Sequence, residues 1–277
     1  MIEIEGLAKT YGAVRAVDGL TLVIEKGEVF GLLGPNGAGK TTIIKMMTAL
    51  SRPDAGTCRI GGYDAEKRSA ESKRLTGVMP QENNLDRELT VQENLLIYGM
   101  LYGLDNLDHR IEETLALVGL TERARSLTSH LSGGMQRRLL LGRALMTDPA
   151  VLFLDEPSIG LDPQIRRQMW DIIRKARIDG RTVVITTHYI EEAESLCDRI
   201  GVVMKGRLIA LDTPTNLKAR VGDYMVEFVN VEGHLVQHMC RTRKEAQDAA
   251  RHIEDGVTIR RSNLEDVFVK LTGERLE

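Results

Sequence analysis

Two spacings of apolar residues alternate along the first part of the chain, and each predicts a different element. Short continuous runs of Val, Ile and Leu are typical of strands buried on both faces. These runs occupy residues 29–33, 151–154 and 182–186. Residues 2–4 and 20–24 alternate apolar and polar positions instead, which indicates strands with one face in water. The sequence therefore predicts strands in two different environments.

Longer segments with apolar residues three or four positions apart predict helices between these strands. The predicted helices cover residues 40–50, 91–104, 110–118, 134–146, 163–177 and 191–197. A hairpin is expected where residues 200–204 and 207–211 flank a short turn. Strand–helix alternation with buried strands implies an α/β core, and the half-exposed strands imply a small antiparallel β subdomain. Helices within about residues 85–148 interrupt the alternation and predict a helical subdomain.

The pattern changes near Val221 and predicts a small α+β appendage over residues 221–277, after a first domain of residues 1–220. Strands are expected at residues 224–231, 235–241 and 257–261, and helices at residues 242–253 and 264–271. These elements follow one another too regularly for a disordered tail, which would be poor in apolar residues. The appendage is therefore expected to fold.

The charge balance argues against a nucleic-acid-binding protein. Lys and Arg number 37 and Asp and Glu number 40, which gives a net charge of -3. Nucleic-acid-binding proteins usually carry a clustered basic excess. The pairs Arg137-Arg138 and Arg166-Arg167 are interpreted as solvated helix faces. No nucleic-acid partner is therefore expected.

The sequence also lacks the segments typical of secreted or membrane-spanning proteins. The N-terminus has neither the basic start nor the apolar stretch of a signal peptide. No window approaches the ~18 consecutive apolar residues of a membrane span. Cys58, Cys197 and Cys240 are odd in number and far apart, which matches neither a metal site nor a disulfide framework. The chain is expected to be cytoplasmic, with reduced thiols.

A glycine-rich segment follows the run at residues 29–33 and opens the helix predicted at Lys40. It consists of Gly34, Pro35, Asn36, Gly37, Ala38, Gly39, Lys40, Thr41 and Thr42. Glycines let the backbone curl so that N–H groups point at an anion, and the helix N-terminus adds partial positive charge. Lys40 can reach the β- and γ-phosphates, and the Thr41 hydroxyl can ligate Mg²⁺. This spacing between strand and helix predicts a phosphate-binding loop rather than an empty glycine turn.

Two adjacent carboxylates end the run at residues 151–154. Asp155 falls at the carboxyl end of a buried strand, where ligands bind in open α/β sheets, and it is suited to hold Mg²⁺. Glu156 can act as general base toward an attacking water. Adjacent carboxylates repel each other unless a cation lies beside them. The pair therefore indicates a metal-assisted site, with a strand ending in solvated acids as the alternative.

A second glycine-rich segment, Leu131 to Gln136, opens the helix predicted from residue 134. Ser132 is a good N-cap residue. Gly133 and Gly134 let another molecule approach the backbone closely. Alone, this segment would predict a helix cap and nothing more.

Together the three motifs resemble those of the nucleotide-binding subunit of ATP-binding-cassette (ABC) transporters, in the same order along residues 1–220. The resemblance implies a P-loop nucleotide-binding core, ATP as substrate and Mg²⁺ as cofactor. It assigns Tyr11 to stacking on adenine and Gln81 to sensing Mg²⁺ as a ligand. His188 matches the switch histidine that contacts the γ-phosphate. Glu156, His188, Gln81 and Lys40 would be the catalytic set.

The resemblance also implies that two chains share each nucleotide. ATP would lie between the phosphate loop of one copy and Ser132, Gly133 and Gly134 of a second copy, which makes a homodimer the expected unit. Gln136 and Asp162 would belong to the same composite site, the latter in a loop at residues 158–162 that crosses the dimer interface. Ile159 in that loop stands where the family usually has a smaller residue.

A transport role is expected through a separate membrane protein. The resemblance implies an integral membrane permease that docks near residues 81–102, and a chain held peripherally on the cytoplasmic face of the cell membrane. Residues 263–273 resemble the ending of daunorubicin-resistance-type exporter ATPases, which favours export. The alternative is a soluble ABC ATPase, such as an iron–sulfur-assembly ATPase. Co-purification with a membrane protein would separate the two.

Overall fold

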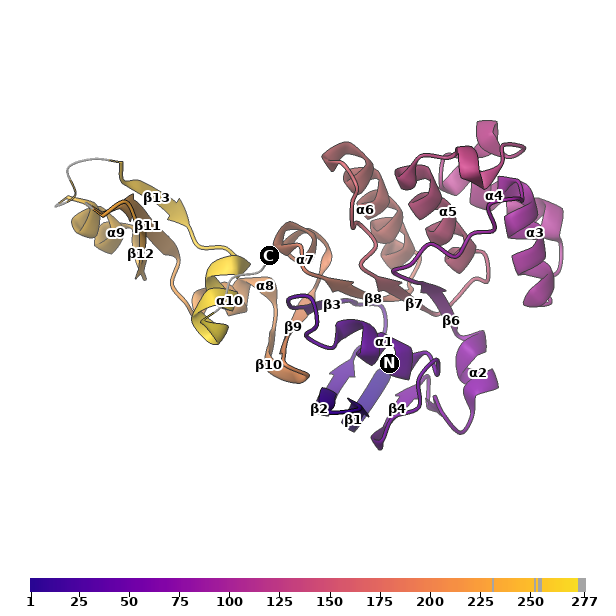
Figure 1. Cartoon of the computed structure of the whole chain (residues 1–277), viewed down its shortest axis with the longest axis horizontal. Helices are drawn as coiled ribbons and strands as arrows, with labels where there is room; N and C mark the ends of the chain where they lie inside the picture. The colour runs from indigo at the N-terminus through magenta and orange to yellow at the C-terminus, as the bar shows by residue number, and fades with distance from the viewer. Residues whose placement is uncertain (231, 252, 254–255, 274–277) are drawn as a thin grey trace.

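Strands of the computed structural model, which describes residues 1–230, 232–251, 253 and 256–273, form three sheets (Figure 1). The largest has the strand order β10-β9-β3-β8-β7-β6. Its strands are β3 (Val29–Leu33), β6 (Thr76–Met79), β7 (Val151–Asp155), β8 (Thr182–Thr187), β9 (Arg199–Met204) and β10 (Arg207–Asp212). All neighbours are parallel except the β9–β10 hairpin. The predicted α/β core and hairpin are therefore confirmed.

A second sheet has the order β2-β1-β4-β5, and its neighbours are all antiparallel. Its strands are β1 (Ile2–Tyr11), β2 (Val14–Ile24), β4 (Ala55–Ile60) and β5 (Tyr63–Asp64). The predicted antiparallel subdomain is confirmed, but β1 and β2 are longer than expected. Bulges interrupt their pairing and shift the side chains between faces, which hides the alternation in the sequence.

Helices on both faces bury the central sheet (Figure 1). Helix α1 (Lys40–Met47) packs on one face with Phe153, whereas α5 (Gly133–Leu145) and α6 (Pro163–Ile178) pack on the other with Leu152 and Leu154. Successive residues of β7 therefore enter two different hydrophobic clusters. This explains why the strand is a continuous apolar run. Short α7 (Ile190–Leu196) follows β8 and joins the same core as α6.

The helical subdomain lies beside β6 and contains α3 (Val91–Leu101), α4 (Leu107–Leu117) and α5 (Figure 1). Helix α3 begins at a capping box in which Thr90 and Glu93 satisfy each other's backbone N–H groups. Two 3₁₀ turns, Thr121–Arg123 and Thr128–His130, lead into α5. A further short helix, α2 (Ser69–Arg74), precedes β6 and was not expected from the pattern.

The third sheet, with the order β12-β11-β13, forms the small α+β unit expected after Val221. Its elements are β11 (Tyr224–Val229), β12 (Leu235–Cys240), α9 (Arg243–Ala250) and β13 (Thr258–Arg261). The strand predicted to reach residue 231 and the helix predicted to include residue 252 run into positions outside the described residues. The unit projects from the rest of the molecule (Figure 1).

The last helix, α10 (Leu264–Thr272), returns to the main core. Its residues Leu264, Val267 and Phe268 are buried in the same cluster as Leu217 of α8 (Pro214–Ala219). The backbone N–H of Leu264 donates to Glu194 of α7 at 3.1 Å. The chain therefore leaves the core after α8 and rejoins it at α10.

The interpretation of Arg137-Arg138 as a solvated helix face was wrong. Arg137 is 7% exposed and Arg138 is half-buried, with a guanidinium hydrogen bond to the Val118 carbonyl at 2.8 Å. Of the second pair, Arg166 is half-buried and Arg167 is exposed. Arginine can be buried when carbonyl oxygens accept from every side of its planar fork.

The three cysteines are free and buried. Burial raises the pKa of the Cys58 thiol to about 12, so this thiol is not ionised near neutral pH. Burial also raises the pKa of Cys197. Buried cysteines with raised pKa values act as small core residues rather than nucleophiles.

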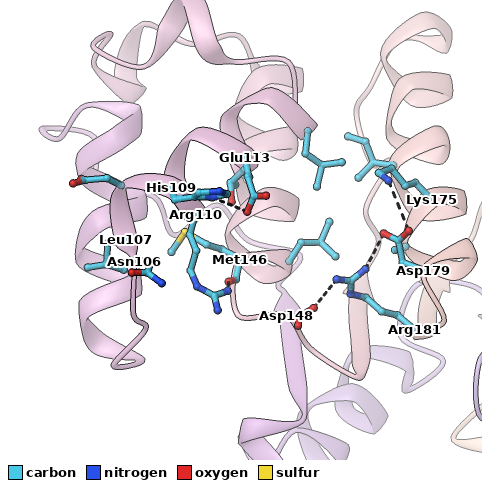
Figure 2. A pocket seen from close by; sticks show the side chains of 16 residues that line it. Asn106, Leu107, His109, Arg110, Glu113, Met146, Asp148, Lys175, Asp179 and Arg181 are labelled. Carbon is cyan, nitrogen blue, oxygen red and sulfur yellow. Dashed lines mark hydrogen bonds and ion pairs between the residues drawn. The ribbon is translucent and has the colours of Figure 1, made fainter.

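A cavity of about 750 Å³ separates α4 from α6 but contains none of the predicted site residues (Figure 2). Its charged side chains neutralise one another: Arg181 pairs with Asp148 at 2.7 Å and with Asp179 at 3.1 Å. Lys175 also reaches Asp179, at 3.7 Å. Since these charges are already balanced, the cavity marks the seam between helical subdomain and core rather than an ion-binding site.

Candidate nucleotide site

The predicted catalytic residues meet at one edge of the central sheet. Strands β3, β8, β7 and β6 are parallel neighbours, so the segments that follow them emerge side by side. These segments carry Lys40, His188, Glu156 and Gln81 respectively. A cavity of about 480 Å³ opens here, and Gln81 and Glu156 line it. Six loop residues line it as well: Asn36, Gly37, Gly39, Lys40, Thr41 and Thr42.

The loop after β3 needs glycine at two positions because other strands pass close to its backbone. A Cβ atom on Gly34 would lie 2.3 Å from the Val203 carbonyl oxygen of β9. One on Gly39 would lie 2.3 Å from the Ala16 carbonyl oxygen of β2, and Gly39 has a φ of +105°. Any side chain there would force these strands apart. Ala38, between them, is buried. The packing of β2 and β9 therefore fixes the loop.

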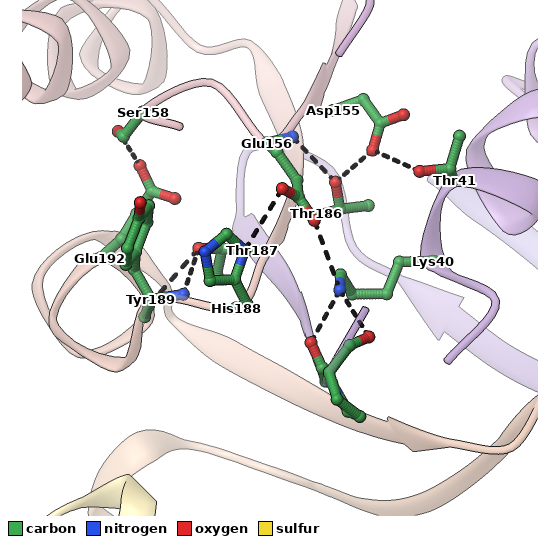
Figure 3. Close-up of polar contacts among 12 residues, drawn as sticks. Lys40, Thr41, Asp155, Glu156, Ser158, Thr186, Thr187, His188, Tyr189 and Glu192 are labelled. Carbon is green, nitrogen blue, oxygen red and sulfur yellow. Dashed lines mark hydrogen bonds and ion pairs between the residues drawn. The ribbon is translucent and has the colours of Figure 1, made fainter. Parts of the chain in front are cut away.

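The Lys40 side chain folds back over this loop. Its Nζ atom donates to the carbonyl oxygens of Gly34 at 2.7 Å and Pro35 at 3.0 Å, and lies 3.4 Å from Glu156 Oε1 (Figure 3). Burial lowers the pKa of Lys40, while the carboxylates of Glu156 and Asp155 oppose this shift. A buried ammonium group of this kind is stabilised by added negative charge, which a phosphate supplies.

Two hydroxyl groups hold the Asp155 carboxylate. Thr41 donates to Asp155 Oδ1 at 3.2 Å, and Thr186 of β8 donates to the same oxygen (Figure 3). Burial raises the pKa of Asp155, and these hydrogen bonds oppose the shift. A buried carboxylate beside a hydroxyl offers the hard oxygen ligands that Mg²⁺ prefers. The donor set thus fits the predicted metal.

Glu156 is held in a backbone conformation that few residues adopt. Its φ is +47°, and its backbone N–H donates to the Thr186 carbonyl at 3.1 Å and the Thr186 hydroxyl at 3.0 Å. A non-glycine residue in the left-handed region costs about 1–2 kcal/mol and is found often at functional sites. The turn aims the Glu156 side chain back toward Lys40 and His188 (Figure 3).

The second glycine-rich segment lies apart from this cavity. Ser132 caps α5, as expected, by accepting from the backbone N–H of Met135 at 3.3 Å. Outside its own helical turn, no atom of the described residues lies within 4 Å of a Cβ placed on Gly133, whereas one on Gly134 would meet Ile165 Cγ2 at 2.7 Å. Neither glycine lines the cavity that holds Lys40. One chain therefore carries two separate glycine-rich helix starts.

Three further predicted residues are engaged in local contacts. Tyr11 is 47% exposed at the end of β1, and its hydroxyl lies 3.1 Å from Ser51 Oγ. Gln136 accepts from Asn83 Nδ2 at 2.6 Å, which joins α5 to the segment after β6. Asp162 caps α6 by accepting from the backbone of Gln164 and Ile165. None of the three lines the cavity beside Lys40.

Sequence reasoning missed Arg137 as part of this site. Its guanidinium donates to the carbonyls of Pro80 and Gln81 at 3.1 and 2.7 Å, and to that of Pro157 at 3.2 Å. It also donates to the Glu156 carbonyl. Arg137 therefore ties the segment after β6 to the turn that carries Glu156. Helical spacing offered a signal, since Arg137 shares a face of α5 with apolar residues three and four positions later.

Comparison with known proteins agrees with this geometry. The family model for ABC transporters matches residues 17–159. A Nod factor export ATP-binding protein I of Paraburkholderia xenovorans is 39% identical over 100% of this chain and 98% of its own length. The linearmycin resistance ATP-binding protein LnrL of Bacillus subtilis is 43% identical over 84% of this chain and 76% of its own length. This chain belongs to the ABC transporter family.

Solved structures of ABC proteins share the fold. The ATP-binding subunit of an ABC transporter superimposes with a TM-score of 0.76 at 26% identity, over 98% of this chain and 99% of that one. A dimeric cassette in a post-hydrolysis state, bound to ADP and Pi, gives a TM-score of 0.71 at 26% identity over 77% of this chain and 98% of that one. This ABC chain is therefore an ATP-binding, ATP-hydrolysing subunit. Within its described residues, no helix combines the length and apolarity of a membrane span.

Proposed function

We propose that the chain powers export of a substrate through a separate membrane subunit, by closing and opening a dimer around ATP. The observation that carries the direction is the match to Nod factor export and linearmycin resistance ATP-binding proteins, the former over the whole chain. In this proposal residues 1–220 form the nucleotide-binding domain, with a helical subdomain at about 85–148, and residues 221–277 form the appendage, whose helix α10 packs back onto that domain. The membrane partner is an integral permease.

The phosphate loop holds the nucleotide in this proposal. Backbone N–H groups of residues 34–39 and the start of α1 receive the phosphates, and Lys40 exchanges its carbonyl partners for phosphate oxygens. Thr41, Asp155 and Gln81 would hold Mg²⁺, which when bound neutralises charge on the phosphate oxygens. Thr42 and Tyr11 complete the nucleotide contacts, the latter against the adenine.

Hydrolysis then depends on Glu156. Its buried carboxylate accepts a proton from the attacking water, while Lys40 balances the charge on its other side. His188, which follows β8 and lies 3.2 Å from Glu156 Oε2, would contact the γ-phosphate. Gln81 reports the state of the site to the helical subdomain through the segment that Arg137 holds. Each of these roles uses a side chain at the same sheet edge.

Two copies complete each site. Ser132, Gly133 and Gly134 of one copy would face the γ-phosphate bound to the other, because they lie outside the cavity of their own chain. The solved cassette dimer of the same fold supports this pairing. Gln136 and Asp162 stand at the starts of α5 and α6 and hold those helices in place for the partner's nucleotide.

The permease is proposed to dock on α3. This helix has apolar residues on both its buried and its exposed sides: Met100 is 64% and Leu101 78% exposed. Ile97 and Tyr102 extend the same surface at 44% and 50%. Exposed apolar patches of this kind mark protein interaction sites. Docking there would hold the chain peripherally on the cytoplasmic face of the membrane.

The test is purification of the tagged chain from detergent-solubilised membranes of its own cells. We expect an integral membrane protein to co-purify with the wild type, and Leu101→Glu to lose that protein. Ile178→Glu is the matched control, since Ile178 is an 83% exposed apolar residue at the end of α6. It should keep the partner. If the wild type retains no membrane protein, the soluble alternative replaces the transporter.

A further inference from the structure

One buried acid near the site has no part in the mechanism above. Glu192 lies in α7, four positions after His188, and is 0% exposed. Its Oε1 atom accepts from the hydroxyl of Ser158 (Figure 3) and from the indole Nε1 of Trp170 at 3.0 Å. Its Oε2 atom accepts no hydrogen bond among the described residues. A carboxyl group is rarely buried without a specific reason.

The two donors come from different parts of the molecule. Ser158 is fully buried and stands two positions after Glu156, in the turn that leaves β7. Trp170 belongs to α6, and its Nε1 also lies 3.3 Å from Ser158 Oγ. Glu192 therefore joins three elements: α7, α6 and the turn after β7. It is fully buried and is not among the residues that line the cavity that holds Lys40.

The segments that Glu192 joins are the ones that carry Glu156 and His188. On one side, the Ile159 backbone N–H donates to the Glu156 carbonyl at 3.3 Å, which makes the turn compact. On the other, the Ala193 N–H donates to the Tyr189 carbonyl at 3.2 Å, which seats α7 directly behind His188. The hydrogen bond between Ser158 and Glu192 therefore links the segment that carries Glu156 to the segment that carries His188.

The chemistry of the site favours a neutral carboxyl group. Burial raises the pKa of Glu192, against the opposing influence of the Ser158, Thr187 and Trp170 side chains and the charge of Arg166. A neutral acid still accepts at Oε1, and it avoids the cost of a buried, unpaired charge. An amide of the same shape would make the same contacts.

We propose that Glu192 is a positioning residue for ATP hydrolysis, whose buried carboxyl group fixes the spacing between the segments that carry Glu156 and His188. The proposal rests on the roles of Glu156 and His188 proposed above. This positioning by Glu192 affects the rate of the chemical step, whereas nucleotide binding depends on the phosphate loop. A misplacement of about 1 Å in a catalytic group can cost as much as ~10²-fold in rate.

Steady-state ATP hydrolysis by the purified full chain, with MgATP, tests the proposal. Glu192→Ala should lower kcat by roughly 10- to 100-fold with KM changed less than about twofold. Glu192→Gln keeps the acceptor and should retain kcat within about twofold. Glu191→Ala is the matched control, because Glu191 is an exposed acid on the same helix. Wild-type kcat in Glu192→Ala, or equal losses in kcat and binding, would overturn the proposal, as would a folded Glu192→Gln that is as slow as the alanine variant.

A second pair of variants covers the case in which Glu192→Ala does not fold. Ser158→Ala removes one donor and should lower kcat severalfold at constant KM. Adding Glu192→Gln to Ser158→Ala should change kcat less than about twofold, because the amide oxygen still accepts from Trp170. A folded Ser158→Ala with wild-type kcat would overturn the positioning role. Glu156→Gln is run beside them: if it keeps wild-type turnover, the proposed base is wrong, whereas an inactive Glu156→Gln with a fully active Glu192→Ala rejects the positioning role alone.

Discussion

His188 Nδ1 lies 3.2 Å from Glu156 Oε2, although the contact lacks hydrogen-bond geometry and leaves both atoms without a hydrogen-bond partner among the described residues. The other oxygen of Glu156 faces Lys40 at 3.4 Å. The Glu156 carboxylate therefore lies between an ammonium group and an imidazole ring, the two groups proposed to contact the phosphates. Its free lone pairs leave room for a water molecule to donate to it.

Glu156→Gln should abolish most hydrolysis without abolishing ATP binding. The amide keeps the shape of the side chain but cannot accept a proton, and loss of a general base typically costs ~10²–10⁴-fold in rate. The variant also removes negative charge near the γ-phosphate, so we expect it to accumulate as an ATP-bound dimer. Phosphate release and size-exclusion chromatography with ATP measure the two effects. Turnover at the wild-type rate would remove Glu156 from the mechanism.

Lys40→Ala should weaken ATP binding as well as slow hydrolysis. The ammonium group contacts phosphate in the ground state and in the transition state, and a charged hydrogen bond is worth about 1.5–3 kcal/mol. Direct titration with a fluorescent ATP analogue should give a Kd at least about tenfold higher. Lys45→Ala, an exposed lysine on the same helix, serves as control. Unchanged affinity in Lys40→Ala would count against the loop as the phosphate site.

A mixture of Lys40→Ala and Gly133→Asp chains should regain activity that neither has alone. Gly133 is the better probe of the second glycine segment because a Cβ added there meets no atom of the described residues beyond its own helical turn, whereas one on Gly134 would collide with Ile165. Aspartate in the first turn of α5 also favours that helix. In a mixed dimer one composite site is intact and the other carries both defects.

The regained activity should rise with protein concentration, since the two chains must meet. The measurement is ATPase rate against mixing ratio at two total concentrations. If each chain used its own Gly133, every site in the mixture would carry a defect. Activity would then equal the sum of the separate proteins at all ratios, and the shared site would have to be abandoned.

Arg137→Met should destabilise the protein and slow hydrolysis together. The substitution leaves the carbonyls of Pro80, Gln81 and Pro157 without their buried donor. An unsatisfied buried acceptor costs about 1–3 kcal/mol. Because the contacts to Pro80 and Gln81 are only partly buried and water can replace the lost donor there, we expect a total loss of about 2–4 kcal/mol in the free energy of unfolding. Urea unfolding measures it, with the exposed Arg167→Met as control. Equal stability of the two variants would show that Arg137 is dispensable.

The stability difference between Glu192→Gln and wild type should depend on pH. Burial raises the pKa of Glu192 in the folded protein above its ordinary value of 4.5. Between pH 4.5 and this raised pKa, the folded protein therefore binds more protons than the unfolded chain. Wild-type stability should therefore fall as pH rises from about 4.5 to the folded pKa, then stay level. The charged groups that act on Glu192 are Arg166 of α6 and Arg137 of α5.

Glutamine does not titrate, so the Gln variant should gain stability relative to wild type across this pH range. Contributions from Asp155 are common to both proteins and cancel. Urea midpoints at several pH values measure the difference. A constant difference would mean that Glu192 has the same pKa in both states, and a difference of opposite sign would mean that it is buried as a charged group.

The sequence predicted the elements whose two faces are both buried or whose ends carry a signal. Strand β7 is a continuous apolar run, and α6 begins at Asp162 followed by proline, as a capped helix should. Strands β4 and β5 were missed because they are short and half-exposed, and only their pairing with β1 and with each other stabilises them. Helix α8 has six residues, which is too few for a periodic pattern.

The residues of the candidate site likewise fall into those that local sequence predicts and those that depend on the fold. Lys40, Asp155 and Glu156 stand in motifs whose spacing is fixed by the turn after one strand, so each could be named from local sequence. Glu192 could not, because its partners come from other elements of the fold. Arg137 shares a helix face with apolar residues, which indicates burial, but its carbonyl partners also come from other elements and could not be named. Only the packing of α7 and α5 against the core turns them inward.

Phe268 of α10 closes the same hydrophobic cluster that contains Leu196 of α7 and Leu217 of α8. During synthesis on the ribosome, the parts of the core from α7 and α8 emerge well before this residue does. Their apolar surfaces therefore remain partly exposed to water while the intervening strands of the third sheet are synthesised. Final assembly of the core is in this sense a late event of translation, and chaperones that shield apolar surface would act during that interval.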